Sequence, residues 1–227
     1  MKILIFGASG MVGQGVLHEC LAAPDVSQVT TVGRTPLEQT HPRLQQLVQS
    51  DLMALEAVEG ELQGFDACFF CLGVSSSGMS EEAYRQLTHE LTLKVASLLA
   101  KLNPEMTFVY VSGAGTDSSE EGRSMWARVK GKTENDLQKL PFRSVYLFRP
   151  SIIQPLHGIQ SKTPAYRYLY RLANPFLSLI RRACPGMIVT TDDIGQAMLN
   201  AARQRGGRVV VEAKDIVRLA RRLSDRG

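Results

Sequence analysis

Three glycines near the N-terminus have a spacing that suits binding of a phosphate group. They stand in the segment Gly7–Gly13, which directly follows the short apolar run Lys2–Phe6. Gly7 permits a tight turn, Gly10 lets backbone approach a pyrophosphate, and Gly13 lets a helix pack closely on a strand. The free N–H groups at the start of such a helix attract phosphate. The motif therefore predicts a dinucleotide cradle, and the alternative is a tight turn without a ligand. The expected contacts come from Gly7, Ser9, Gly10, Met11, Val12 and Gly13.

Arg34 bears on which dinucleotide such a cradle would take. It follows the β-branched run Gln28–Val32, where NAD-binding chains usually carry a carboxylate for the ribose 2′-OH, and no acid stands here. A guanidinium can instead pair with a 2′-phosphate and stack on adenine. The sequence therefore favours NADP(H) over NAD(H), and the alternative is an ordinary surface arginine.

Further cofactor contacts are expected at the ends of later strands. Asp51 and Leu52 follow a weak apolar run, and Asp51 suits an adenine contact or a helix N-cap equally well. Leu72 and Gly73 follow a strongly apolar run, where small residues would let a cofactor pass close to the backbone. Pro150, in the turn after another such run, completes the expected set.

The elements that would position these residues alternate along the chain. Strands are expected over Lys2–Phe6, Gln28–Val32, Leu47–Gln49, Ala67–Cys71, Thr107–Ser112, Ser144–Phe148 and Arg208–Val211. Helices are expected over Met11–Ala22, Glu81–Leu102, Arg123–Leu140 and Asp215–Leu223. The second helix should bury one face made of Leu87, Leu91, Val95, Leu98 and Leu99. This alternation predicts an α/β protein with a doubly wound parallel sheet, Rossmann-like, in one domain over residues 1–227. Residues 154–188 depart from it and are expected to form a small C-terminal helical annex on the substrate side.

Composition excludes several other classes of protein. With 44% hydrophobic residues and a net charge of +4, the chain is ordinary for a globular domain and offers no clustered basic stripe for nucleic acid. No apolar run reaches the roughly 18 residues of a membrane span. Cys68 and Cys71 should point to opposite faces of a strand, which argues against a redox pair. The four histidines lack metal-ligand spacing, so no metal site is predicted. Four cysteines in a chain with no signal-peptide pattern indicate a reducing compartment, so the expected location is the cytoplasm.

Several segments together resemble a known superfamily. These are Gly7–Gly13, Val32–Arg34, Phe69–Gly73, Val109–Gly115, Val129–Glu134, Phe148–Ser151 and Val189–Gly195. Their order is similar to that of the short-chain dehydrogenase/reductase superfamily, and more narrowly to its atypical, epimerase-like branch that includes the Tat-interacting-protein oxidoreductases. The resemblance implies that Ser112 polarises a substrate and that Lys130 holds the nicotinamide ribose. A tyrosine would stand four residues before that lysine to supply the proton, but this chain has Trp126.

Because Trp126 stands where the family has a tyrosine, two functions remain open. The first is an NADP(H)-dependent oxidoreductase acting on an unidentified small carbonyl or hydroxyl compound. Its proton would come from another group, and the candidates are Tyr84, His89, Tyr166, Tyr168 and Tyr170. The second is a catalytically weak or inactive NADP(H)-binding redox sensor that acts through a protein partner. Such a partner could use the arginine-rich annex or the basic tail Lys214–Arg226, and the chain could be a monomer or a homodimer.

Overall fold

A seven-stranded parallel sheet forms the centre of the molecule. The computed structural model describes residues 1–159, 187–204 and 206–221. The strands lie in the order β3-β2-β1-β4-β5-β6-β9, and every neighbouring pair is parallel. They are β1 (Lys2–Phe6), β2 (Gln28–Gly33), β3 (Leu44–Val48), β4 (Ala67–Phe70), β5 (Thr107–Val111), β6 (Ser144–Arg149) and β9 (Arg208–Glu212). The strand order reverses at β1, so a crevice opens at the carboxyl ends of β1 and β4.

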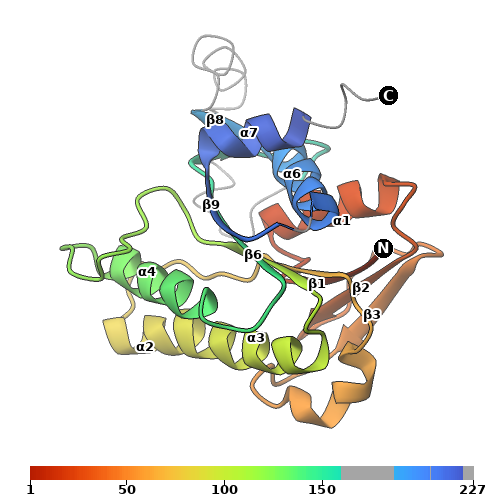
Figure 1. Ribbon diagram of the computed structural model, residues 1–227, viewed down its shortest axis with the longest axis horizontal. Helices are drawn as coiled ribbons and strands as arrows, with labels where there is room; N and C mark the ends of the chain where they lie inside the picture. The colour runs from red at the N-terminus through yellow and green to blue at the C-terminus, as the bar shows by residue number, and fades with distance from the viewer. Residues whose placement is uncertain (160–186, 205, 222–227) are drawn as a thin grey trace.

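Helices cover both faces of this sheet (Figure 1). One face carries α1 (Met11–Ala22), α6 (Thr191–Gln204) and α7 (Ala213–Arg221). The other carries α2 (Glu81–Arg85), α3 (Leu91–Leu102) and α4 (Met125–Leu137), with a π-helical turn, η2 (Gln86–Glu90), joining α2 to α3. A 3₁₀ segment, η1 (Leu55–Leu62), precedes β4, and a separate two-stranded sheet pairs β7 (Ile152–Gln154) with β8 (Ile188–Thr190). The expected doubly wound α/β fold is confirmed.

The strand β1 shows why two separate cores form. Ile3 and Ile5 belong to the apolar cluster beneath α1, α6 and α7, whereas Leu4 and Phe6 belong to the cluster beneath α3 and α4. Successive side chains of a strand point to opposite faces, so a strand buried on both faces is apolar throughout. All four side chains are fully buried.

The two cysteines of β4 and its end follow the same alternation. Cys68 packs in the cluster beneath α3 and α4, and Cys71 packs against the cluster on the other face. Both are free thiols, and burial raises the pKa of Cys71 to about 12. The prediction that they point to opposite faces is confirmed.

Several expected boundaries were wrong. The strand placed at Leu47–Gln49 spans Leu44–Val48, because two glutamines sit within an edge strand whose side chains are largely accessible. The helix expected over Arg123–Leu140 spans Met125–Leu137, and the last helix begins at Ala213. Ser112 lies just past the end of β5. Leu87 is 46% exposed, since Tyr84 and Thr88 occupy the buried face there.

One expectation involves residues outside the described part of the chain. The annex expected at 154–188 falls mostly on residues 160–186, which are not described. Its two ends are the short strands β7 and β8. Within the described ranges, no helix combines the length and apolar character needed to cross a bilayer.

Candidate functional site

The turn between β1 and α1 has no space for larger side chains. Gly7 has φ +79°, and a Cβ added to it would lie 2.6 Å from the Leu72 backbone nitrogen. A Cβ added to Gly13 would lie 2.1 Å from the Gly7 carbonyl oxygen. The Gly10 N–H donates to that same oxygen at 2.9 Å. These close approaches fix the path of the backbone, so the turn requires glycine at both ends.

The start of α1 is open to an anion. Gly10 is its N-cap; among the described residues no side chain caps this end, and no acid stands in the first turn. The first N–H groups of a helix lack partners within the helix and carry partial positive charge. The turn and the helix start together form the geometry that phosphate groups bind.

A cavity of ≈ 350 Å³ opens where β1, β2 and β3 end. It is lined by Gly7, Ala8, Ser9, Thr31, Val32, Gly33, Arg34, Thr35, Leu37, Gln46, Leu47, Val48, Leu52 and Leu72. Of the residues that the sequence suggested, the cavity brings together Gly7, Ser9, Arg34, Leu52 and Leu72. Arg34 is exposed at its rim and makes no ion pair within the described ranges.

Sequence reasoning missed Gln46, which shapes one wall of this cavity. Its side-chain oxygen accepts the Leu37 N–H at 2.7 Å, and its nitrogen donates to the Leu37 and Gln39 carbonyls at 3.2 Å. Gln46 therefore holds the loop after β2 against β3. The signal that could have found it is a polar residue in the middle of a strand.

Other suggested cofactor residues lie outside this lining. Gly10, Met11, Val12 and Gly13 belong to the start of α1, and Gly73 follows Leu72 on the way out of β4. Asp51 is exposed and accepts the Met53 N–H at 2.8 Å. It therefore stabilises a turn and is not the helix N-cap considered beside the adenine contact, because the N-cap of the following 3₁₀ segment is Ala54. The Pro150 carbonyl accepts the Ala114 N–H at 2.9 Å.

Lys130 lies at the ends of β5 and β6, beside Ser112. Its ammonium donates to the Ser112 carbonyl oxygen at 2.5 Å. Burial lowers the pKa of Lys130 to about 8, against an opposing influence of the Glu134 carboxylate. Lys130 is therefore charged at neutral pH and loses its proton only in mildly alkaline solution.

The Ser112 hydroxyl is directed into the protein. Its oxygen lies 2.5 Å from Oε1 of Glu134 and 3.1 Å from the Phe148 carbonyl oxygen. Glu134 has a side chain only 1% exposed. The next residue, Gly113, has no side chain, so it cannot polarise a substrate in place of the Ser112 hydroxyl.

Arg149 provides the positive charge that Glu134 needs. Its Nη2 lies 2.5 Å from Oε2 of Glu134, and its Nε lies 3.1 and 3.2 Å from the two carboxylate oxygens. Arg149 also contacts Ser118 Oγ at 2.6 Å and Glu212 at 3.3 Å. The network joins α4, β6 and the loop after β5, and sequence reasoning missed it because its members lie far apart along the chain.

Trp126 lies one turn before Lys130 on α4 and packs against the loop after β5. A Cβ added to Gly115 would lie 3.5 Å from Cη2 of its ring. Residues four apart share one helix face, so the indole and the ammonium are neighbours. An indole N–H only donates a hydrogen bond and cannot exchange a proton at neutral pH.

The other candidate proton donors are held elsewhere or are not described. Tyr84 is 2% exposed in the core, where burial raises the pKa of its phenol. His89, in η2, pairs with Asp136 of α4 at 2.8 Å. Tyr166, Tyr168 and Tyr170 lie outside the described residues.

Comparison with known proteins identifies the family of the chain. Residues 3–135 match the model of the NAD dependent epimerase/dehydratase family. Protein HTATIP2 of Rattus norvegicus is 30% identical over 155 residues, covering 67% of this chain and 62% of that protein, so the match spans less than two thirds of the rat protein. The protein named FMP52, mitochondrial, of Chaetomium globosum is 24% identical over 226 residues, covering 96% of each chain.

Solved structures share the fold at low identity. The Bordetella bronchiseptica enzyme WbmH, in complex with NAD+, superimposes with a TM-score of 0.66 at 16% identity, covering 92% of this chain and 74% of WbmH. MoeE5, in complex with UDP-glucose and NAD, gives 0.68 at 17% identity, covering 99% and 82%. The epimerase-like family that the motifs suggested is confirmed: this chain belongs to the NAD dependent epimerase/dehydratase family.

Proposed function

We propose that the chain binds NADP(H) and acts as an oxidoreductase on a small carbonyl or hydroxyl compound. The observation that carries the proposal is Arg34 at the rim of the cavity, with no carboxylate at the end of β2. Complexes of WbmH and MoeE5 with NAD+ or NAD support a nicotinamide dinucleotide as the class of ligand. Arg34 narrows that class to the phosphorylated form, because a guanidinium binds phosphate with two parallel hydrogen bonds.

Different residues around the cavity bind different parts of the nucleotide. The turn at Gly7 and Ser9 and the open start of α1 hold the pyrophosphate. Arg34 holds the 2′-phosphate, while Leu37, Val48 and Leu52 supply apolar walls for adenine.

Lys130 serves the reacting end of the site. When bound, the cofactor supplies or accepts the hydride. The Lys130 ammonium, charged at neutral pH and fixed by the Ser112 carbonyl, donates to the ribose hydroxyls. Trp126 provides an apolar wall that keeps water from that end.

A thermal-shift titration with NADPH and NADH tests the Arg34 contact. At 100 times the dissociation constant, a ligand adds about 2.7 kcal/mol of stability, or roughly 5–11 °C for a chain of this size. We expect that rise with NADPH and a small one with NADH. The Arg34→Ser variant should lose the preference for NADPH, because the 2′-phosphate loses its charged partner.

Arg123→Ser is the matched control, since Arg123 is exposed and lies outside the cavity lining. It should behave as the unchanged protein does. An equal rise with both nucleotides, or a preference that survives Arg34→Ser, would show that Arg34 does not select the cofactor.

A second candidate function is a redox sensor that binds NADP(H) with little or no turnover. Two observations favour it: the Ser112 hydroxyl is engaged by Glu134, and Trp126 stands where a proton donor is needed. In this case the bound nucleotide changes a surface that a protein partner reads. Both candidates require nucleotide binding in the same cavity, so binding measurements do not distinguish them. Measurements of catalytic turnover do.

The variant Trp126→Tyr separates the two candidates. A phenol at this position lies one helical turn from Lys130, whose charge would lower its pKa. A positioned proton donor is worth about 10²–10⁴-fold in rate. If the chain is a sensor, NADPH oxidation with a panel of carbonyl compounds should be absent in the natural protein and appear in the variant. If the chain is an enzyme, the natural protein oxidises NADPH, and the Trp126→Tyr variant is less active because it alters the apolar wall beside Lys130.

A further inference from the structure

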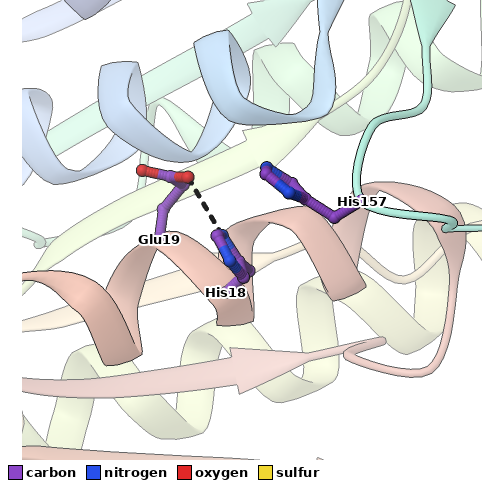
Figure 2. Close-up of side chains that lie close together, drawn as sticks. All are labelled: His18, Glu19 and His157. Carbon is purple, nitrogen blue, oxygen red and sulfur yellow. Dashed lines mark hydrogen bonds and ion pairs between the residues drawn. The ribbon is translucent and has the colours of Figure 1, made fainter.

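Two histidines and a glutamate converge between α1, the start of α6 and the loop after β7, in a place that sequence spacing did not indicate. His18 and Glu19 are neighbours on α1, and His157 comes from the loop after β7 (Figure 2). One ligand atom from each of the three lies within 4.8 Å of the other two. None of the three lines the cavity at the ends of β1, β2 and β3. This cluster is therefore separate from the cofactor site.

The fold holds His157 in place through the start of α6. Its Nε2 lies 2.8 Å from Oδ2 of Asp192, and the neighbouring Leu156 N–H donates to Thr191 Oγ1 at 3.1 Å. His157 itself has φ +53°, a conformation that few residues other than glycine adopt. The contact with Asp192 occupies Nε2 and leaves Nδ1 available. Histidines that bind metals usually donate their other ring N–H to such a carboxylate.

Among the described residues, Glu19 is a buried carboxylate that no lysine or arginine pairs with. Its residue is 7% exposed, and one carboxylate oxygen accepts from the neutral amide of Gln196. Within the described ranges its only ion-pair partner is His18, whose Nδ1 lies 3.1 Å from Oε1. A histidine is mostly neutral at pH 7, and a buried charge is costly unless it is paired or binds a metal.

The spacing of these atoms suits a transition-metal ion. Zinc is bound at about 2.0–2.2 Å by histidine nitrogen and carboxylate oxygen, so two ligands in a tetrahedral site lie roughly 3.3 Å apart. The 3.1 Å between His18 and Glu19 is close to that separation. The two imidazole rings are stacked with centroids 4.3 Å apart. Their side chains are 48% and 45% exposed, so turning both nitrogens toward one ion disturbs little packing.

We propose that His18, Glu19 and His157 form a binding site for Zn²⁺, with Asp192 as the carboxylate that orients His157. Three protein ligands leave a fourth position for water on the exposed side. The ion supplies the positive charge that buried Glu19 lacks. It also ties α1 to the loop after β7, two segments far apart in the sequence (Figure 2). The site does not depend on the proposed oxidoreductase activity.

Isothermal titration of the metal-free full chain with zinc chloride tests this proposal. We expect one Zn²⁺ per chain, and at least a 100-fold loss of affinity in His18→Ala and in His157→Ala. Asp192→Asn should weaken binding about 10–100-fold, because it removes the group that orients His157. His41→Ala is the control and should leave the affinity unchanged, since His41 is not one of the three clustered residues and its Nδ1 accepts the Arg43 N–H at 3.1 Å.

Proton competition provides a second readout. Protons compete with the metal for the ligating nitrogens, so zinc affinity should fall as the pH is lowered. Circular dichroism of the variants shows that each one folds, which is expected because both histidine side chains are half-exposed. Absence of stoichiometric zinc binding, or binding that His18→Ala and His157→Ala leave intact, would overturn the proposal.

Discussion

Arg149→Met is expected to lower the free energy of unfolding by about 3–5 kcal/mol, which is the usual cost of removing one partner from a buried ion pair. Glu134, whose side chain is only 1% exposed, would lose the guanidinium that pairs with its carboxylate. The substitution also removes the contacts of Arg149 with Ser118 and Glu212, which join β6 to the loop after β5 and to the end of β9. Denaturation in guanidinium chloride at pH 7, with Trp126 fluorescence as the signal, measures the change.

Two further variants show whether burial is the cause. The double variant Glu134→Leu and Arg149→Met removes both charges and should recover most of the stability, as paired replacements of buried ions often do. Arg85→Met breaks two ion pairs, with Glu82 and Glu90, whose side chains are between 39% and 62% exposed, and should cost at most about 1 kcal/mol. If Arg149→Met costs no more than Arg85→Met, the buried network contributes little to stability.

Gly13→Ala is expected to abolish nucleotide binding. The added methyl group would lie 2.1 Å from the Gly7 carbonyl oxygen and 2.7 Å from the Ala8 Cα, so the backbone of the turn must move. Such overpacking typically costs about 1–3 kcal/mol in stability. The same movement displaces the N–H groups at the start of α1, so the thermal stabilisation by NADPH should disappear.

Gly60→Ala is the matched control for this change. Nothing lies within 4 Å of a Cβ at Gly60, and its backbone has no positive φ. The variant should keep both its stability and its nucleotide response. A Gly13→Ala protein that still gains stability from NADPH would mean that the nucleotide binds elsewhere.

The fold was largely predictable because its strands are apolar on both faces. The run Lys2–Phe6 and the glycines after it indicate a strand, a turn and a helix start without further information. The strand β3 was misplaced for the opposite reason: at the sheet edge, Gln45 and Gln46 interrupt the apolar pattern. The sheet β7–β8 joins segments on either side of the annex, and no local pattern indicates such a pairing.

The candidate site was predictable only where one short segment provides it. The glycine turn and Arg34 follow from strand ends that can be located in the sequence. The direction of the Ser112 hydroxyl could not be predicted, because it depends on a carboxylate from α4 and a guanidinium from β6. Likewise, His18 and His157 come together through the packing of α1 beside α6, which spacing along the chain does not encode.

The opposite orientation of Cys68 and Cys71 has a consequence for chemical labelling. Burial raises the pKa of the Cys68 thiol well above its usual value and that of Cys71 to about 12, so almost no thiolate exists at neutral pH. Alkylating reagents and peroxides react with thiolates. In the folded sheet Cys68 is fully buried beneath α3 and α4, whereas Cys71 is partly exposed just past the end of β4. The rate at which Cys68 is modified therefore measures how often the sheet opens.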